Sequence, residues 1–373
     1  MTGELLSFQQ RRDWLRLLKS ENVGPVTFLK LINRYGGATQ ALRALPELSN
    51  RGGLKRPIRI CPPENAERDL EAADHIGAKF IAYGEPDYPA LLRQTDGAPP
   101  LVCAKGNFDL LNEPSIALVG SRNASAVGRK FARTLATAFG KAGFVTVSGL
   151  ARGIDTSVHE ASLQTGTIAV VAGGIDIVYP PENGPLHEEI FAKGVVISEM
   201  VPGVRPQARH FPRRNRLISG ITLGTVVVEA ATRSGSLITA RLAGEQNREV
   251  FAVPGSPLDP RAGGTNKLIK DGAVLVTKAD DVIEVITELN DRQSQQGDFF
   301  ASHSNDFTEF ETQDLPDMSV QEQIISLLSP TPTHIDDLVR ESGAAIGDVH
   351  TVLLELELAA RLERHTGHRV SLV

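Results

Sequence analysis

Short runs of β-branched and apolar residues alternate with amphipathic stretches from about residue 80 to residue 290, and no other feature restricts the possible folds as much. Between the runs, apolar residues recur at helical spacing, as Phe131, Leu135 and Phe139 do. Strands that are apolar at every position are typical of a parallel sheet with helices on both faces. We therefore predict a doubly wound α/β domain over residues 76–290. Its expected strands contain Ile116–Val119, Val145–Val147, Ile168–Val171, Val195–Ile197, Val226–Val228, Val250–Val253 and Val274–Val276.

The N-terminal segment has a helical pattern, with breaks at Gly24-Pro25 and Gly36-Gly37. Residues 1–60 contain eleven Lys and Arg against four Asp and Glu. We predict a small helical domain of the SAM or helix-hairpin-helix type over residues 1–75. Two interpretations of it are open. Either the turn at Asn22–Pro25 donates backbone N–H groups to a DNA phosphate, or the domain is a helical bundle with a solvated basic face.

Residues 291–317 lose this periodicity and contain seven acidic residues against one basic residue, which is typical of a flexible linker. Residues 318–373 are predicted to form three helices and a two-stranded hairpin, the arrangement of a winged helix. The expected elements are helices near Gln321–Leu328, Ile335–Glu341 and Ile346–Leu358, and strands at Leu362–Arg364 and Arg369–Leu372.

The composition of this winged helix disfavours contact with duplex DNA. Residues 318–373 contain eight acidic residues against four basic ones. The third expected helix contains Glu355 and Glu357, with no Lys or Arg before Arg361. Phosphates repel such a surface, so we expect the domain to contact protein or to act as a tether.

The whole chain has a formal net charge of −6. This charge does not exclude a nucleic-acid partner, because only charges within a Debye length of about 8–10 Å act on a polyanion. Cys61 and Cys103 lack the spacing of a metal or redox site, and no cofactor is expected. No charged-then-apolar leader opens the chain, and no apolar run approaches the ~20 residues of a membrane span. We therefore expect a cytoplasmic protein.

The loops after the predicted strands are the candidate site, because ligands of open parallel sheets bind at the carboxyl ends of the strands. Gly120, Ser121 and Arg122 follow one strand. The glycine leaves backbone N–H groups accessible and the arginine adds a bidentate donor, both of which suit a phosphate. This loop has neither a GxGxxG pattern nor a P-loop lysine. After the next strand, Asp155 is predicted to be a helix N-cap.

The segment from Met200 to Val228 contains five arginines and no acidic residue. Arginines without neighbouring carboxylates, interleaved with the aromatic ring of Phe211, suit a nucleic-acid backbone and an unstacked base. A solvated charged face is the alternative, but the position of this segment at the ligand-binding edge favours an anionic ligand. The arginines are Arg205, Arg209, Arg213, Arg214 and Arg216.

Six motifs in these loops resemble the DNA-processing protein A family (DprA, also called Smf), and the resemblance covers about residues 80–290. The motifs are Gly120–Arg122, Ser148–Asp155, Tyr179–Asn183, Phe211–Gly220, Arg233–Ala240 and Phe251–Gly255. One departure is Ala172-Gly173-Gly174, where the family usually has a Gly-x-Gly-like turn; the same bend fits there.

The resemblance implies an extended Rossmann-type domain that binds single-stranded DNA and loads the RecA recombinase in natural transformation and recombination. It also implies a homodimer that is not an enzyme. By motif, the family's DNA-binding residues correspond to Gly120, Ser121, Arg122, Phe211, Arg214, Asn215 and Arg216, and we also include Arg213 in the predicted site. We extend the site by position to Arg209, Gly235, Ser236, Asn266 and Lys267.

A nucleotide-hydrolysing enzyme is the alternative, because similar sheets also occur in phosphoribohydrolases. Those enzymes have a Pro-Gly-Gly-x-Gly-Thr loop, and the corresponding turn here, Thr232–Ser236, lacks that pattern. Glu199 and Glu229 end two strands and are candidates for acid/base residues, but pairing with Arg213 or Arg233 is the commoner role of such carboxylates. We therefore expect a binding protein without catalytic activity.

Overall fold

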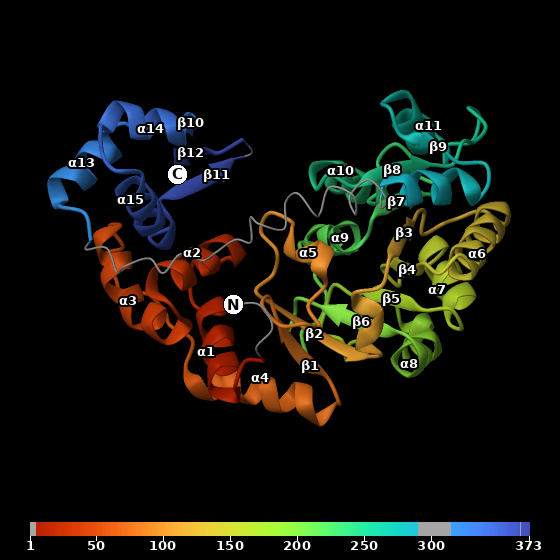
Figure 1. Ribbon diagram of the computed structural model, residues 1–373, viewed down its shortest axis with the longest axis horizontal. Coiled ribbons are helices and arrows are strands. Elements are labelled where there is room, and N and C mark those ends of the chain that lie inside the picture. The colour runs from red at the N-terminus through yellow and green to blue at the C-terminus, as the bar shows by residue number, and fades with distance from the viewer. Residues whose placement is uncertain (1–4, 290–314, 366) are drawn as a thin grey trace. The chain divides into compact units, whose positions relative to one another are not determined.

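The computed structural model describes residues 5–289, 315–365 and 367–373 (Figure 1). The chain forms two compact units. The first contains residues 69–289. The second combines residues 6–68 with residues 315–373, so two segments from far apart in the sequence fold together.

A nine-stranded sheet forms the first unit, in the order β1-β2-β6-β5-β4-β3-β7-β8-β9. From β6 to β9 in this order, adjacent strands are parallel to one another, which confirms the predicted doubly wound α/β fold. The antiparallel strands β1 and β2 were not predicted. The strands are β1 (Lys79–Ala82), β2 (Leu101–Gly106), β3 (Ser115–Val119), β4 (Val145–Ser148), β5 (Thr167–Val170), β6 (Val195–Ser198), β7 (Gly224–Val227), β8 (Glu249–Ala252) and β9 (Val274–Leu275).

The two sides of β3 show why these strands are apolar throughout. Ile116 and Leu118 belong to one buried cluster, Ala117 and Val119 belong to another, and all four are at most 4% exposed. Helices α6 and α7 cover the first cluster, and α9 and α10 cover the second. The helices of this unit are α4 (Pro63–His75, which begins in the second unit), α5 (Ala90–Arg93), α6 (Ala126–Lys141), α7 (Ile154–Ser162), α8 (Gly184–Lys193), α9 (His210–Ile221), α10 (Ser236–Glu245) and α11 (Gly263–Lys270), with 3₁₀ turns at Phe108–Leu111 and Pro181–Asn183. Residues 280–289 are also helical.

The strand order reverses beside β3. From β3 the chain proceeds to β4, β5 and β6 on one side, and it then returns to place β7 on the other side of β3. A crevice for a ligand is expected outside the carboxyl ends of the two strands at such a switch point.

The second unit contains the predicted helical domain and the predicted winged helix, which are both confirmed. Strand β10 was not predicted, because two residues are too short to give a pattern. Most of the expected linker at 291–317 lies outside the described residues. The elements are α1 (Phe8–Leu18), α2 (Pro25–Tyr35), α3 (Ala38–Arg51), α13 (Met318–Ser326), β10 (Thr333–His334), α14 (Ile335–Ser342), α15 (Ile346–Leu358), β11 (Leu362–His365) and β12 (Arg369–Leu372).

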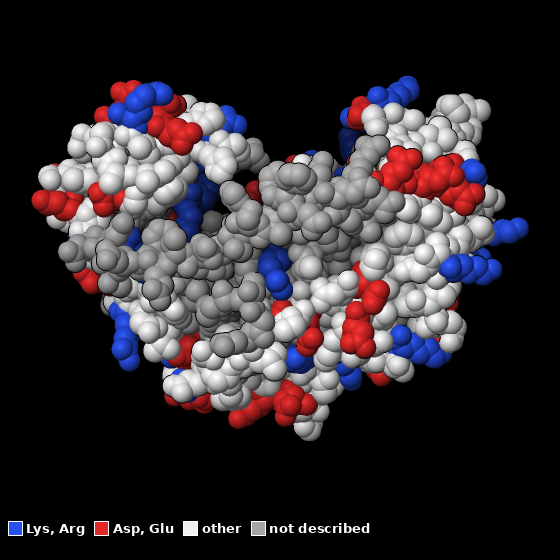
Figure 2. Space-filling view, viewed as in Figure 1, with Lys and Arg blue, Asp and Glu red and all other residues white. Residues whose placement is uncertain are grey.

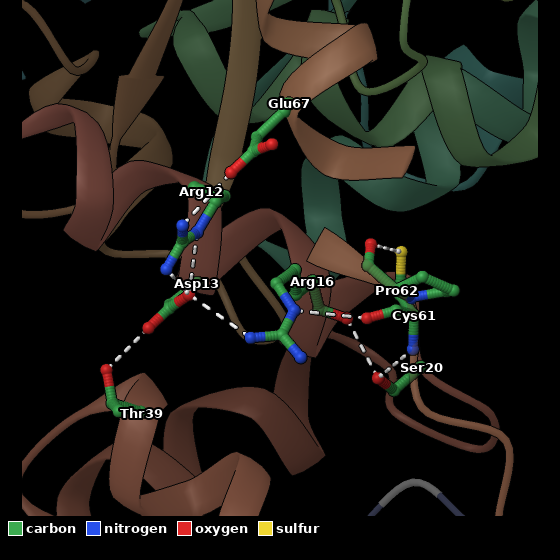
Figure 3. A network of polar contacts seen from close by, with 8 residues as sticks. All are labelled: Arg12, Asp13, Arg16, Ser20, Thr39, Cys61, Pro62 and Glu67. Atoms are coloured by element: carbon green, nitrogen blue, oxygen red, sulfur yellow. Dashed lines mark hydrogen bonds and ion pairs between the residues drawn. The ribbon is translucent and has the colours of Figure 1, made fainter. Parts of the chain in front are cut away.

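Asp13 on α1 is the centre of a polar network in the N-terminal helices (Figure 3). Its carboxylate accepts a 2.6 Å hydrogen bond from the Thr39 hydroxyl and contacts the guanidinium groups of Arg12 and Arg16. Arg16 in turn donates to the carbonyl of Cys61, so the network joins α1 to α3 and to the segment before α4. Arg12 and Arg16, two of the basic residues of this region, therefore already form ion pairs within the domain.

Glu21 forms ion pairs with two more arginines of this region. It pairs with Arg56 at 2.5 Å and with Arg59 at 3.4 Å. Because these arginines already have a carboxylate partner, the pairs favour a helical bundle over a domain that binds DNA phosphates.

Among the described residues, no helix has the length and apolar composition that a membrane crossing requires.

We expect Asp13→Asn to destabilise the second unit by about 1.5–3 kcal/mol at neutral pH, because hydrogen bonds to a charged group are lost. Burial pushes the pKa of Asp13 upward, but hydrogen bonds from Thr39, Arg12 and Arg16 outweigh burial and leave its pKa lowered. The carboxylate therefore stabilises the fold above the ordinary Asp pKa of about 3.9, and this stabilisation is lost as the pH falls through the lowered value. The difference between wild type and variant should shrink on acidification.

Fluorescence of Trp14, the only tryptophan in the chain, measures this unit selectively during urea unfolding. The ring is buried and packs edge-on against Phe28 at 5.0 Å. Glu67→Gln is the matched control, because it removes only a partly exposed ion pair with Arg12. Equal effects of the two substitutions would contradict the central role of Asp13.

Candidate functional site

A cleft of about 580 Å³ lies at the carboxyl ends of β3 and β7, at the switch point of the sheet. The loop after β3 contributes Gly120–Asn123, and the loop after β7 contributes Ala231 and Arg233–Ser236. Helix α9 supplies the floor with residues between Phe211 and Ile218. A smaller hollow of about 60 Å³ shares Arg122, Phe211 and Arg214 with the cleft and is also lined by Tyr179.

Arg214 is the most unusual residue of the cleft, because its side chain is buried without a partner. It is 6% exposed, and its Nε has no hydrogen-bond acceptor. Among the described residues, no hydrogen bond or ion pair to this guanidinium is formed. Burial, opposed by the charge of Asp155 and assisted by the charge of Arg122, lowers the pKa of Arg214 to about 10. A buried cation without a partner is unfavourable, so this guanidinium is suited to receive an anion.

Phe211 brings two guanidinium groups and a second aromatic ring together. The Cζ atoms of Arg122 and Arg214 lie 5.0 Å and 5.9 Å from its ring centroid, within cation–π range. Tyr179, which is 47% exposed, lies 5.7 Å from the same ring at a tilt of 57°. Arg122 is exposed and forms no ion pair within the described part of the chain. Positive charge therefore lies beside an aromatic surface that is open to a ligand.

Asp155 and Gly149 belong to the surroundings of the Arg214 guanidinium. The predicted N-cap role of Asp155 is wrong, because α7 begins at Ile154 with Gly153 as its N-cap. The Asp155 carboxylate instead accepts hydrogen bonds from the backbone N–H groups of Gly149 and Ala151. A Cβ atom on Gly149 would lie 1.3 Å from Nη1 of Arg214, so only glycine leaves room for the guanidinium.

Eight of the predicted site residues line the cleft. Asn215 donates to the carbonyl of Gly235 at 3.3 Å and so connects α9 to the loop before α10. Ser236 lies at the N-terminus of α10, with its hydroxyl 2.7 Å from that of Ser234. The eight residues are Gly120, Ser121, Arg122, Phe211, Arg214, Asn215, Gly235 and Ser236.

Arg213 and Arg216 lie outside the cleft and contact Glu199 instead. Arg216 forms an ion pair with Glu199, and its other Nη atom donates to the carbonyl of Gly97 at 2.5 Å. Arg213 lies 3.8 Å from the same carboxylate. The geometry thus favours a structural role for Arg216, in contrast to the predicted phosphate contact.

Three other predicted residues also do not line the cleft. Arg209 is the exposed N-cap of α9. Asn266 exchanges hydrogen bonds with the backbone of Gly255, at 3.1 and 2.9 Å, and so holds the loop after β8. Lys267 is exposed on α11.

Sequence reasoning missed Asn123, Tyr179 and Arg233 as residues around these hollows. Arg233 is exposed and forms no ion pair with another described residue. Its position after a predicted strand was a usable signal, because Gly235 and Ser236 were chosen on the same ground.

The two candidate acid/base residues have structural partners. Glu229 accepts hydrogen bonds from the backbone N–H and the hydroxyl of Ser125, at 2.9 and 2.5 Å, at the start of α6. Glu199 is held by Arg216.

Burial lowers the pKa of His159 to about 3, and its Nδ1 contacts the Thr167 hydroxyl at 2.7 Å. Among the described residues, no group of three or more His, Cys, Asp or Glu is arranged to hold a metal ion.

The positive charge of the cleft is local. On the face seen in Figure 2, basic and acidic side chains of the described residues are interspersed. An anion is therefore attracted mainly at short range, by Arg122, Arg214 and Arg233.

The family profile of the DNA recombination-mediator protein A matches residues 79–287. The chain belongs to this family. Profiles of the DprA-like N-terminal HHH domain and of the DprA winged helix domain match residues 8–72 and 309–368. The resemblance to DprA seen in the loop motifs is thereby confirmed.

Relatives named DprA or Smf align over much of the chain. DNA processing protein DprA of Streptococcus pneumoniae is 47% identical over 274 residues, which cover 71% of this chain and 95% of that protein. Protein Smf of Synechocystis is 30% identical over 386 residues, which cover 95% of this chain and 97% of that protein.

Two solved DprA structures share the fold of this DprA-family chain. The structure from Streptococcus pneumoniae aligns with a TM-score of 0.62 at 36% identity, covering 73% of this chain and 97% of that one. The structure from Helicobacter pylori aligns with a TM-score of 0.52 at 27% identity, covering 57% of this chain and 96% of that one. The Helicobacter pylori work describes a single-stranded DNA binding mode of that protein.

We expect Arg216→Ala to lower the stability of the first unit by about 2–4 kcal/mol, because Glu199 would be left buried and incompletely paired. Arg122→Ala is the matched control, since that side chain is exposed and unpaired, and its effect should stay within about 0.5 kcal/mol. Thermal unfolding followed by circular dichroism tests both variants, with Trp14 fluorescence showing that the second unit is unchanged. Wild-type stability of Arg216→Ala would contradict its structural role.

Proposed function

We propose that the cleft binds the backbone of single-stranded DNA. The observation that carries the proposal is the buried, unpartnered guanidinium of Arg214 at the switch point of the sheet. A phosphate would supply the missing charge and accept the free N–H. Arg122 lies beside the same Phe211 ring and provides a second donor for the same strand.

The aromatic pair favours a single strand over a duplex. Tyr179 and Phe211 present ring surface beside the cations, and a base can stack there only when it is free of its own neighbours. The Helicobacter pylori relative, described for binding single-stranded DNA, supports the same assignment. Arg213 and Arg216 are not part of the proposed contact surface.

The proposed role is binding without catalysis. Glu199 and Glu229 are both engaged in structural contacts, which leaves the cleft without a free carboxylate from either strand end. RecA loading, homodimer formation and a cytoplasmic location follow from the family resemblance and the sequence, and we retain them as part of the proposal.

A gel-shift titration with single- and double-stranded oligonucleotides at two salt concentrations tests the proposal. We expect Arg122→Ala to weaken all single-stranded sequences alike and to reduce the salt slope by ~0.7, because one phosphate contact is lost. Phe211→Leu should cost ~1–3 kcal/mol of affinity with the slope unchanged, since stacking releases no counterions. Folded variants with wild-type affinity and slope would refute the site, and release of free nucleobase would show catalysis.

Gly149→Ala tests Arg214 without changing any charge. The added methyl group would occupy the position of the guanidinium, so single-strand affinity should fall by about tenfold or more, equivalent to ~1.4 kcal/mol. Gly244→Ala is the matched control, because it lies in α10 outside the cleft and no atom lies within 4 Å of its Cβ position. If both alanines bind DNA like the wild type, Arg214 does not hold the strand.

A further inference from the structure

Helix α15 of the winged helix is buried on two sides. One set of its residues lies in the core of the winged helix: Val349, Val352, Leu353 and Leu356. A second set recurs at helical spacing outside that core and is at most 3% exposed: Thr351, Leu354, Glu355 and Leu358. A helix that is buried all round requires a partner on each side.

The partner of the second side is the N-terminal helical domain. Helix α15 packs against α3 and α2 (Figure 1). Nε of Arg51 donates to the fully buried carboxylate of Glu355 at 2.6 Å. Nε2 of Gln321 donates to the other oxygen of Glu355 and to the carbonyl of Arg51, both at 2.8 Å. Both oxygens of the buried carboxylate are therefore satisfied, and one of them depends on a residue more than 300 positions away.

The two backbones also approach closely. A Cβ atom on Gly52 would lie 1.9 Å from the carbonyl oxygen of Glu355, and Arg361 donates to the carbonyl of Gly52 at 3.1 Å. Nδ2 of Asn22, in the turn between α1 and α2, donates to the carbonyl of Leu358 at 2.8 Å. This turn is the one that a helix-hairpin-helix would use to contact a phosphate.

We infer that α15 is a protein-recognition helix whose partner is the N-terminal helical domain of the same chain, and that residues 6–68 and 315–373 act as one module. In helix-turn-helix proteins that read duplex DNA, the recognition helix inserts into the major groove. Here α15 has acidic residues and no Lys or Arg, and its second face is covered by α3. The same helix engages the α1–α2 turn. Neither α15 nor the α1–α2 turn is therefore free to contact a duplex, and this inference is independent of the proposed single-strand site.

The full chain with Gly52→Ala tests the inference by hydrogen exchange. The φ of Gly52 is −65°, so alanine suits the backbone and the expected effect comes from the clash with Glu355. We expect exchange in residues 346–358 to rise by about tenfold or more, with no change in residues 115–228. The thermal midpoint reported by Trp14 should fall by roughly 4 °C or more.

Gly24→Ala is the matched control, because no atom lies within 4 Å of its Cβ position and its extended backbone accepts alanine. It should exchange like the wild type. Glu355→Gln is a second variant in case Gly52→Ala does not fold; it retains the shape of the interface and should raise exchange in both α3 and α15. Wild-type protection of α15 in both interface variants would overturn the inference. A gain of duplex affinity in Gly52→Ala would also overturn it, since α15 would then be a masked DNA reader.

Discussion

The neighbouring parallel strands β3 and β7 determine where this protein can hold a ligand. The helices that follow these two strands pack on opposite faces of the sheet. Helix α6 follows β3 and covers one face, and α10 follows β7 and covers the other. Between the two departing chains lies the cleft, which the loops after β3 and β7 and helix α9 line. The cleft is a consequence of that divergence, and α9 contributes Arg214 and Phe211 to its lining.

The sequence was sufficient for the parallel strands of the sheet and for the loops that line the cleft, for one physical reason. Strands buried on both faces must be apolar at every position, so their ends are visible, and the loops after them follow directly. The antiparallel β1 and β2 were missed because they lack the helix-strand alternation that identified the rest. Asp155 was misassigned because the start of α7 depends on Gly153, whose φ of +79° is not evident from sequence.

The sequence did not reveal which arginines between Met200 and Val228 form ion pairs and which face the cleft. Arg214 and Arg216 are two residues apart and have the same chemistry, yet the helical turn directs them differently. Arg214 faces the cleft without a partner, and Arg216 reaches Glu199 at the end of β6. Which arginine is free depends on the pairing of α9 with a distant strand end. The acidic α15 shows the opposite case, since its composition correctly excluded a basic surface although its partner was not predicted.

The pairing of α3 with α15 also imposes an order on synthesis. Arg51 and Glu355 are 304 positions apart, and a ribosome adds about 5–20 residues per second, so about 15–60 s separate the two residues during translation. Throughout that interval the N-terminal helices lack the surface that later covers Gly52, while the nine-stranded sheet can already fold. The last domain to be translated thus completes the first, and a chain interrupted before α15 exposes an unfinished N-terminal domain to chaperones and proteases.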